Sequence, residues 1–219
     1  MTKLTDKILM NKQGISDFLK ALSEGRACLH PTDTLPGLAF DPDVSAGGDV
    51  ALRFKTGHES KSFLNLVHSF DFALTLWTPL PKRWNEVLDT IWPAPLSVIW
   101  QASPSAPRSV VGDDGTIGLR VPKLSRGNSW LNTVMKELGR PLPSTSVNRH
   151  GEKPAMSWED AKKTISGESG FYIPAVKVEN STETKPSSIV SVNNDGSFTM
   201  IREGAVKTSE IEKLLDENR

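Results

Sequence analysis

The 219-residue sequence lacks most of the features that mark secreted, membrane and zinc-binding proteins. Its single cysteine, Cys28, excludes an internal disulfide, and the absence of a CxxC or Cys/His cluster argues against a structural zinc site. No apolar run approaches the length that spans a bilayer, and residues 1–14 lack the apolar core of a signal peptide. We therefore expect a cytoplasmic protein with no membrane partner and no metal-ligating residues.

Excess charge of either sign is also absent. Lys plus Arg and Asp plus Glu number 26 each, so the bulk charge gives no argument for a nucleic-acid partner, although a local basic face remains open. The length can bury one large core or two small ones. No internal repeat or low-complexity segment divides the chain. We interpret it as one domain.

Hydrophobic periodicity and turn residues predict a series of helices and strands along the sequence. Helices are predicted over Ile15–Leu22, Val50–Lys55, Trp84–Ile91, Trp130–Leu138, Ser157–Ile165 and Ser209–Leu215. Strands are predicted over Ala27–His30, Phe63–Val67, Leu96–Trp100, Thr116–Pro122, Phe171–Val178, Pro186–Val192 and Phe198–Arg202. We expect the tryptophans to lie in the core rather than to stack on bases.

The segment HPTDTLPGLAFDPD, His30–Asp43, follows the first predicted strand and is the most informative stretch. Its first two prolines fix φ and remove backbone donors, and Gly37 permits the close approach of a ligand or a turn with positive φ. Two threonines and Asp33 add hydroxyls and a carboxylate. From these residues alone, the segment is either a ligand loop at a strand end or a proline-braced turn in which Asp33 caps local amides.

Two further segments place polar side chains at strand ends. In TIGLRVP, alternation puts Thr116, Gly118 and Arg120 on one side, and a strand arginine either binds an anion or pairs with a carboxylate. In PLPSTSVNRHG, Ser144, Ser146 and Asn148 alternate, so their side chains point the same way. Three such groups can hold phosphate and ribose oxygens without adding charge, although serine and asparagine also cap strand ends.

Several motifs, in order, resemble those of one family. PTDTLPGL resembles PTDTVYGL, the signature of the YrdC/Sua5 threonylcarbamoyl-AMP synthases. KTGHESK is similar to KxRPxxKP at the same spacing, WPAPLSVIW to WPGPLT, and TIGLRVP to TVGVRVP. PLPSTSVNRHG resembles PLxSTSAN(x)SG, PSSIVSV resembles PSTIVD, and IREGAV resembles LRxGAI. The sequence is identified as a divergent member of this family from about residue 14 to residue 206.

The resemblance implies a YrdC-like single α/β domain over residues 1–219, with a twisted mixed sheet, flanking helices and an open central cavity. It also implies that the additional C-terminal domain of longer Sua5 proteins is absent. The implied activity is that of a nucleotidyltransferase, an L-threonylcarbamoyladenylate synthase. This enzyme forms threonylcarbamoyl-AMP and pyrophosphate from L-threonine, bicarbonate and ATP for the t6A37 modification of tRNA.

The family's reaction needs no covalent nucleophile, so the resemblance implies alignment and charge neutralisation rather than a catalytic residue. Mg2+ is expected to accompany ATP. The implied partners are tRNA or double-stranded RNA and the t6A transferase machinery. By the motif matches, the threonine site comprises Thr32, Thr34, Arg120, Ser144 and Ser188. The nucleotide site comprises Lys55, Lys61, Thr116, Ser146, Asn148 and Arg202.

Two departures from the motifs bear on activity. Gly57 stands where the family has an arginine, and glycine cannot bind phosphate bidentately. Arg149 and His150 add positive charge nearby, which we expect to offset this loss in part. Pro36 replaces the aromatic residue of the signature. Two alternatives therefore stay open: a YciO-like paralogue that binds a nucleotide with another acceptor, and a non-enzymatic double-stranded RNA-binding protein.

Overall fold

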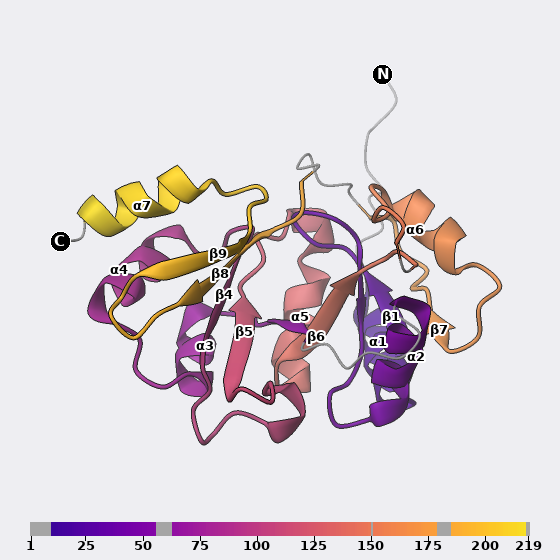
Figure 1. Cartoon of the computed structure of the whole chain (residues 1–219). Coiled ribbons are helices and arrows are strands. Elements are labelled where there is room, and N and C mark those ends of the chain that lie inside the picture. The colour runs from indigo at the N-terminus through magenta and orange to yellow at the C-terminus, as the bar shows by residue number, and fades with distance from the viewer. Residues whose placement is uncertain (1–9, 56–62, 150, 179–184, 218–219) are drawn as a thin grey trace.

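The computed structural model describes residues 10–55, 63–149, 151–178 and 185–217. Helices and strands are interspersed along these ranges (Figure 1). The α-helices are α1 (Lys12–Ser23), α2 (Ser45–Lys55), α3 (Phe70–Leu76), α4 (Lys82–Ile91), α5 (Trp130–Leu138), α6 (Trp158–Ile165) and α7 (Thr208–Glu217). Two single turns of 3-10 helix are η1 (Arg108–Val110) and η2 (Arg126–Asn128). No helix within the described ranges is long and apolar enough to cross a membrane.

The strands form one mixed sheet in the order β7-β1-β2-β6-β3-β5-β4-β8-β9. They are β1 (Ala27–His30), β2 (Gly37–Ala39), β3 (Leu64–Leu66), β4 (Leu96–Gln101), β5 (Thr116–Arg120), β6 (Leu142–Ser146), β7 (Phe171–Tyr172), β8 (Ser188–Val192) and β9 (Phe198–Arg202). The pairs β1/β7, β3/β5 and β4/β8 are parallel, whereas the other neighbouring pairs are antiparallel. The twisted mixed sheet with flanking helices is the predicted fold class.

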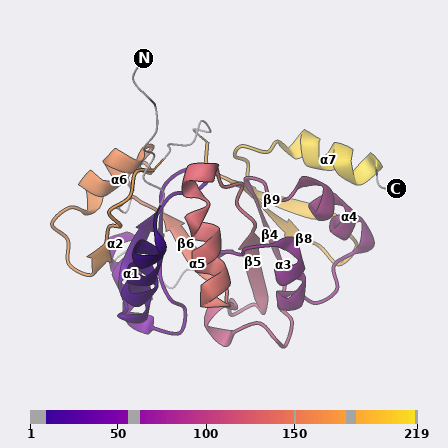
Figure 2. The same cartoon turned by 180° about the vertical axis from the view of Figure 1, so that it is seen from behind.

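Helices α1, α5, α3 and α4 lie on one side of the sheet (Figure 2). Under α3 and α4, a core that includes the buried Trp77, Trp84, Trp92 and Trp100 packs on β4, β5 and β8. Each of these indoles donates to a backbone carbonyl, so the tryptophans are core residues as predicted. On the opposite side, seen in Figure 1, β5 and β6 have no helix of the described chain in front of them.

Local signals set several helix ends where the sequence predicts them. The Ser157 side chain caps α6 by accepting the Asp160 amide, and Gly139 ends α5 in the left-handed conformation at φ 66°. Strands β8 and β9 form the predicted hairpin around residues 193–196. Strand β7 lies at the sheet edge as expected, but it stops at Tyr172, so the predicted strand over Phe171–Val178 is too long.

One strand and one α-helix were not predicted. Strand β2 lies inside the His30–Asp43 segment, where the sequence indicates only a loop, and it pairs with β1 and β6 on its two sides. Helix α3 begins after Ser69, whose side chain accepts the Phe72 amide. Both elements are short, so neither contains enough residues to show a period.

Candidate functional site

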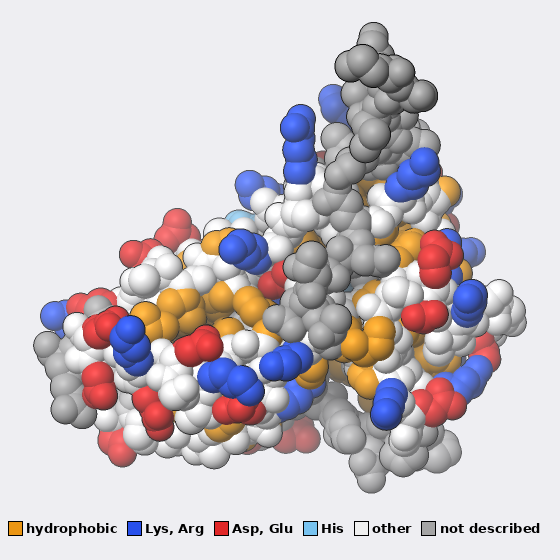
Figure 3. Space-filling model, turned by 90° about the horizontal axis from the view of Figure 1, so that it is seen from above, with side chains coloured by type: hydrophobic (Ala, Val, Ile, Leu, Met, Phe, Trp, Pro, Cys, Tyr) orange, Lys and Arg blue, Asp and Glu red, His pale blue; other side chains and the backbone are white. Residues whose placement is uncertain are grey.

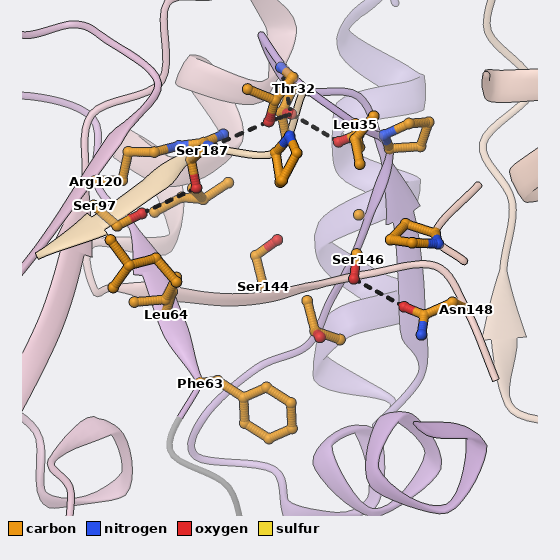
Figure 4. A pocket seen from close by; sticks show the side chains of 18 of the residues that line it. Thr32, Leu35, Phe63, Leu64, Ser97, Arg120, Ser144, Ser146, Asn148 and Ser187 are labelled. Atoms are coloured by element: carbon orange, nitrogen blue, oxygen red, sulfur yellow. Dashed lines mark hydrogen bonds between the residues drawn. The ribbon is translucent and has the colours of Figure 1, made fainter. Parts of the chain in front are cut away.

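A cavity of about 730 Å3 opens at the middle of the sheet, where β2, β3, β5 and β6 run beside one another. Its volume lies in the range of small-molecule sites. Figure 4 shows Arg120, Ser97 and Ser187 at one end, Ser146 and Asn148 at the other, and Ser144 between them. Most of the predicted site residues line it: Thr32, Thr34, Lys55, Arg120, Ser144, Ser146, Asn148 and Arg202.

The loop between β1 and β2 is held by its own threonines. Thr32 Oγ1 donates to the Leu35 carbonyl at 2.8 Å and accepts the Thr34 amide at 3.0 Å. Because that proton is already used, the Thr34 hydroxyl donates to Thr32 Oγ1 across 3.1 Å. Thr34 Oγ1 in turn accepts from Arg120 Nη1 at 3.3 Å. The threonines therefore shape the cavity wall and connect it to β5.

Arg120 forms a buried ion pair at the end of β5. Its Nη2 lies 2.8 Å from Asp33 Oδ1, and the two side chains are 6% and 7% exposed. The other Asp33 oxygen accepts the Lys123 amide at 3.1 Å. Burial lowers the pKa of Arg120, and the charge of Asp33 opposes that shift. Of the two sequence interpretations, pairing with a carboxylate is present in the structure, while anion binding stays a prediction.

Arg202 brings a second guanidinium to the same end of the cavity. Its Nε and Nη2 donate to the Ser187 carbonyl at 3.0 and 2.8 Å, and Nη2 also lies 3.2 Å from Ser187 Oγ. These acceptors are neutral. Burial first, and then the nearby charge of Arg120, lower the pKa of Arg202. Asp33 neutralises the charge of Arg120, whereas no carboxylate is described beside Arg202 at this end. The positive charge of Arg202 therefore favours the binding of an anion here.

The opposite end is a network on α2 and β6. Lys55 Nζ donates to Ser146 Oγ at 2.9 Å and to Asn148 Oδ1 at 2.7 Å, and Ser146 Oγ donates to the same Asn148 oxygen at 2.9 Å. The Asn148 amide nitrogen donates to the carbonyls of Arg149 and Glu152. This network fixes a cation beside two polar groups, an arrangement suited to phosphate or ribose oxygens.

His30 lies behind the cavity at the end of β1 and is completely buried. Its Nδ1 lies 3.0 Å from the Pro31 carbonyl and its Nε2 lies 2.9 Å from Ser144 Oγ. Burial is the largest cause of a lowered pKa of about 4, which the Pro31 hydrogen bond opposes and the charge of Arg120 reinforces. The imidazole is therefore neutral at neutral pH.

This buried histidine predicts a pH dependence of stability. Above pH 6.5 the imidazole is neutral in both the folded and the unfolded chain. As the pH falls toward 4, the unfolded chain binds a proton at His30 that the native protein excludes, so stability is lost by up to about 3 kcal/mol. We expect urea titrations at pH 7 and pH 4.5 to show a smaller decrease for His30→Gln than for the wild type. An equal decrease would contradict the assignment of a buried neutral imidazole.

Two predicted site residues do not line the cavity, and a third lies outside the described residues. Thr116 lies at the far end of β5, where its hydroxyl donates to Asp114 at 2.8 Å. The Ser188 hydroxyl is buried away from the cavity and accepts the Gly204 and Val206 amides. Its neighbour Ser187 lines the cavity instead. Lys61 lies outside the described residues, as do Gly57 and His150.

Arg149 was expected to replace part of the missing arginine charge. It pairs instead with Glu168, and its guanidinium lies 5.0 Å from the centre of the Phe54 ring. It does not belong to the cavity lining. Its charge is thus offset by a carboxylate, which weakens the case for Arg149 as the replacement.

Site roles for Asp33, His30, Ser97 and Ser187 were not predicted from the sequence. Ser97 and Ser187 line the cavity, and their hydroxyl oxygens lie 3.3 Å apart. Ser97 was detectable as a polar residue inside the apolar strand β4. Ser187 had no such signal, because only the pairing of β8 with β4 decides which of two adjacent serines faces the cavity.

The cavity does not provide a magnesium site by itself. Among the described residues, no group of three or more His, Cys, Asp or Glu side chains could hold a metal ion. Asp33, the carboxylate beside the cavity, is paired with Arg120. These residues do not fit a resident Mg2+.

The family model for Sua5, YciO and YrdC, described as "Telomere recombination", matches residues 20–204. The chain belongs to this family. A protein of Pseudoalteromonas translucida named threonylcarbamoyl-AMP synthase is 25% identical over 194 residues, which are 87% of this chain and 99% of that protein. A protein of the same name from Coxiella burnetii is 30% identical over 143 residues, covering 65% of this chain and 74% of that protein.

Solved structures of the family share the fold. The P. abyssi Sua5 complexed with L-threonine matches with a TM-score of 0.77 at 20% identity, and the match covers 91% of this chain and 56% of that one. The E. coli YciO structure matches with a TM-score of 0.74 at 18% identity, covering 91% and 93% of the two chains. The present chain therefore spans little more than half of the Sua5 protein and nearly all of YciO.

Proposed function

We propose that this protein is a threonylcarbamoyl-AMP synthase, a nucleotidyltransferase that joins L-threonine, bicarbonate and ATP. The observation that carries the proposal is that one cavity holds Arg120 and Arg202 at one end and the Lys55 network at the other. Curated relatives that share 25–30% identity bear this name. In t6A synthesis the product would pass to the transferase machinery that modifies tRNA.

The proposed reaction suits side chains that bind rather than attack. The amine of threonine adds to carbon dioxide and releases a proton, or adds to bicarbonate and releases water. A carbamate oxygen then attacks the α-phosphorus of ATP. The bond from that phosphorus to the bridging oxygen breaks, and pyrophosphate leaves with the electron pair. The protein's one thiol, Cys28, is buried with a raised pKa, which does not suit a nucleophile.

The described residues supply positioning and charge for such a reaction. Arg202 at one end of the cavity and Lys55 at the other would hold the phosphates of ATP, and Ser146 and Asn148 would bind neutral oxygens. Thr34 and Arg120, which are connected to each other, would shape the threonine side. Thr116 and Ser188 are not part of this proposed arrangement, because their hydroxyls are bound elsewhere.

The test is mass spectrometry of the products formed from ATP, Mg2+, bicarbonate and L-threonine, with each component omitted in turn. We expect threonylcarbamoyl-AMP only in the complete mixture. ATP turnover that is indifferent to threonine would instead indicate a YciO-like protein with another acceptor. Intact ATP despite nucleotide binding would exclude the synthase.

Binding of double-stranded RNA receives no support from the face in Figure 3. On that face, Lys and Arg side chains are interspersed with Asp and Glu side chains, so there is no continuous positively charged surface for a nucleic acid to follow. The balanced net charge agrees with this picture. We therefore do not propose RNA binding as the primary function.

A further inference from the structure

His30 and Ser144 form a hydrogen-bonded pair that crosses strand β2. His30 lies opposite Gly37 in the β1/β2 register, and β2 separates it from Ser144 on β6. A Cβ atom at Gly37 would lie 2.6 Å from His30 Nε2 and 2.8 Å from Ser144 Oγ, closer than real Cβ atoms approach. The glycine therefore makes room for the 2.9 Å contact between the imidazole and the hydroxyl.

The geometry fixes which atom of this pair donates. The Pro31 carbonyl can only accept a hydrogen bond, so His30 Nδ1, 3.0 Å away, carries the proton. A neutral imidazole has one N–H group, which leaves Nε2 as an acceptor. The Ser144 hydroxyl is then the donor to His30. The lowered pKa of about 4 agrees with a neutral ring.

This assignment determines what Ser144 offers to a ligand. A hydroxyl has one proton, and His30 already receives it. Ser144 lines the cavity, midway between the two ends in Figure 4, and the described residues make no other hydrogen bond to its oxygen. The oxygen therefore presents only lone pairs to the cavity. A ligand gains a hydrogen bond there only by donating an N–H or O–H group.

We infer that His30 is a positioning residue that makes Ser144 an obligate hydrogen-bond acceptor, selecting a donor group on the bound ligand. For its choice of ligand the inference rests on the proposed function, in which L-threonine offers an amine and a side-chain hydroxyl. His30 itself does not line the cavity. It acts through the hydroxyl and not on the reacting atoms.

The first experiment measures L-threonine affinity by calorimetry in a double-mutant cycle of His30→Leu and Ser144→Ala. We expect His30→Leu to weaken binding by about 3- to 10-fold, because the Ser144 proton is released to point at the ligand donor. In the Ser144→Ala background, His30→Leu should have little further effect. Equal losses in both backgrounds would overturn the inference and indicate a structural role.

Matched variants separate positioning from folding. His30→Gln can place its amide oxygen where Nε2 lies, so we expect it to recover most of the affinity. His68→Leu removes the other described histidine with a lowered pKa, which stacks on Phe72 and does not line the cavity, and should leave binding unchanged.

Replacing L-threonine by L-2-aminobutyrate, which lacks the hydroxyl, distinguishes the two donors. If the effect of His30→Leu disappears, the hydroxyl is the donor, and if it persists, the amine is.

A second measurement requires no variant. Nitrogen-15 NMR of the wild type should show His30 with a protonated Nδ1 and an unprotonated Nε2 from pH 6 to pH 8. An Nε2-protonated ring or an imidazolium would overturn the inference. If the wild type binds ATP but not L-threonine, the proposed function fails separately, and the same cycle run with ATP tests the ribose hydroxyls as donors. If the effects of His30→Leu and Ser144→Ala on affinity are additive for L-threonine and also for ATP, the inference is overturned as well.

Discussion

Replacing Asp33 with alanine is expected to lower the free energy of unfolding by about 3–5 kcal/mol. The variant leaves the Arg120 guanidinium buried without its counter-charge, since the two side chains are 6% and 7% exposed. It also removes the acceptor of the Lys123 amide. Urea titration at pH 7 measures the change directly. The loss is large because a buried charge without a partner is far more costly than a broken surface pair.

The control for this prediction is a solvent-exposed ion pair, in which the same loss of a carboxylate leaves no buried charge. Lys82 and Glu86 lie 3.6 Å apart with side chains 90% and 39% exposed. We expect Glu86→Ala to change stability by less than about 1 kcal/mol. Asp33→Asn keeps the shape of the side chain and one acceptor oxygen, so its loss of stability should lie between those of Asp33→Ala and Glu86→Ala. An effect of Asp33→Ala as small as that of Glu86→Ala would mean that Arg120 is solvated in solution.

Arg202→Gln is expected to weaken ATP binding by about 10- to 100-fold, as measured by calorimetry. A charge-assisted hydrogen bond contributes about 1.5–3 kcal/mol to binding. At the end of the cavity that contains Arg120 and Ser187, Arg202 is the guanidinium whose hydrogen-bond acceptors are neutral, so its charge is available to a phosphate. The substitution keeps a donor near Ser187 but removes the charge. The loss should shrink when AMP replaces ATP if Arg202 contacts the β- or γ-phosphate.

Arg108→Gln provides the matched control for that prediction. Arg108 is exposed at the start of η1 and does not line the cavity, so the same change of charge should leave ATP affinity within about twofold of the wild type. An equal loss in the two variants would indicate a long-range effect of net charge. Unchanged affinity in Arg202→Gln would remove Arg202 from the proposed nucleotide site.

Much of the cavity was predictable because its residues follow strand alternation. Ser144, Ser146 and Asn148 were placed on one side of a strand end from their spacing, and all three line the cavity. The Arg120 side chain was expected to point out from one side of a strand, and it does so at the end of β5. In each case a period of two, together with apolar neighbours, determines where the side chain points.

Other features depend on partners that no local pattern reveals. Thr116 shares a strand with Arg120, but four residues of extended chain separate them by about 13 Å, which carries Thr116 beyond the cavity. The choice of Ser187 over Ser188 follows from the pairing of β8 with β4. Similarly, the ion pair of Arg120 with Asp33 joins distant segments, so the sequence left both interpretations of Arg120 open.

The cavity wall draws on residues from Thr32 to Arg202, and neighbouring strands such as β2 and β6, or β4 and β8, come from distant parts of the chain. Such a high contact order means that loop-closure entropy must be overcome before any part of the wall is complete. The wall is complete only after these distant strands have paired. Ligand binding and global folding are therefore linked, and a ligand present at 100 times its Kd should raise the unfolding free energy by about 2.7 kcal/mol.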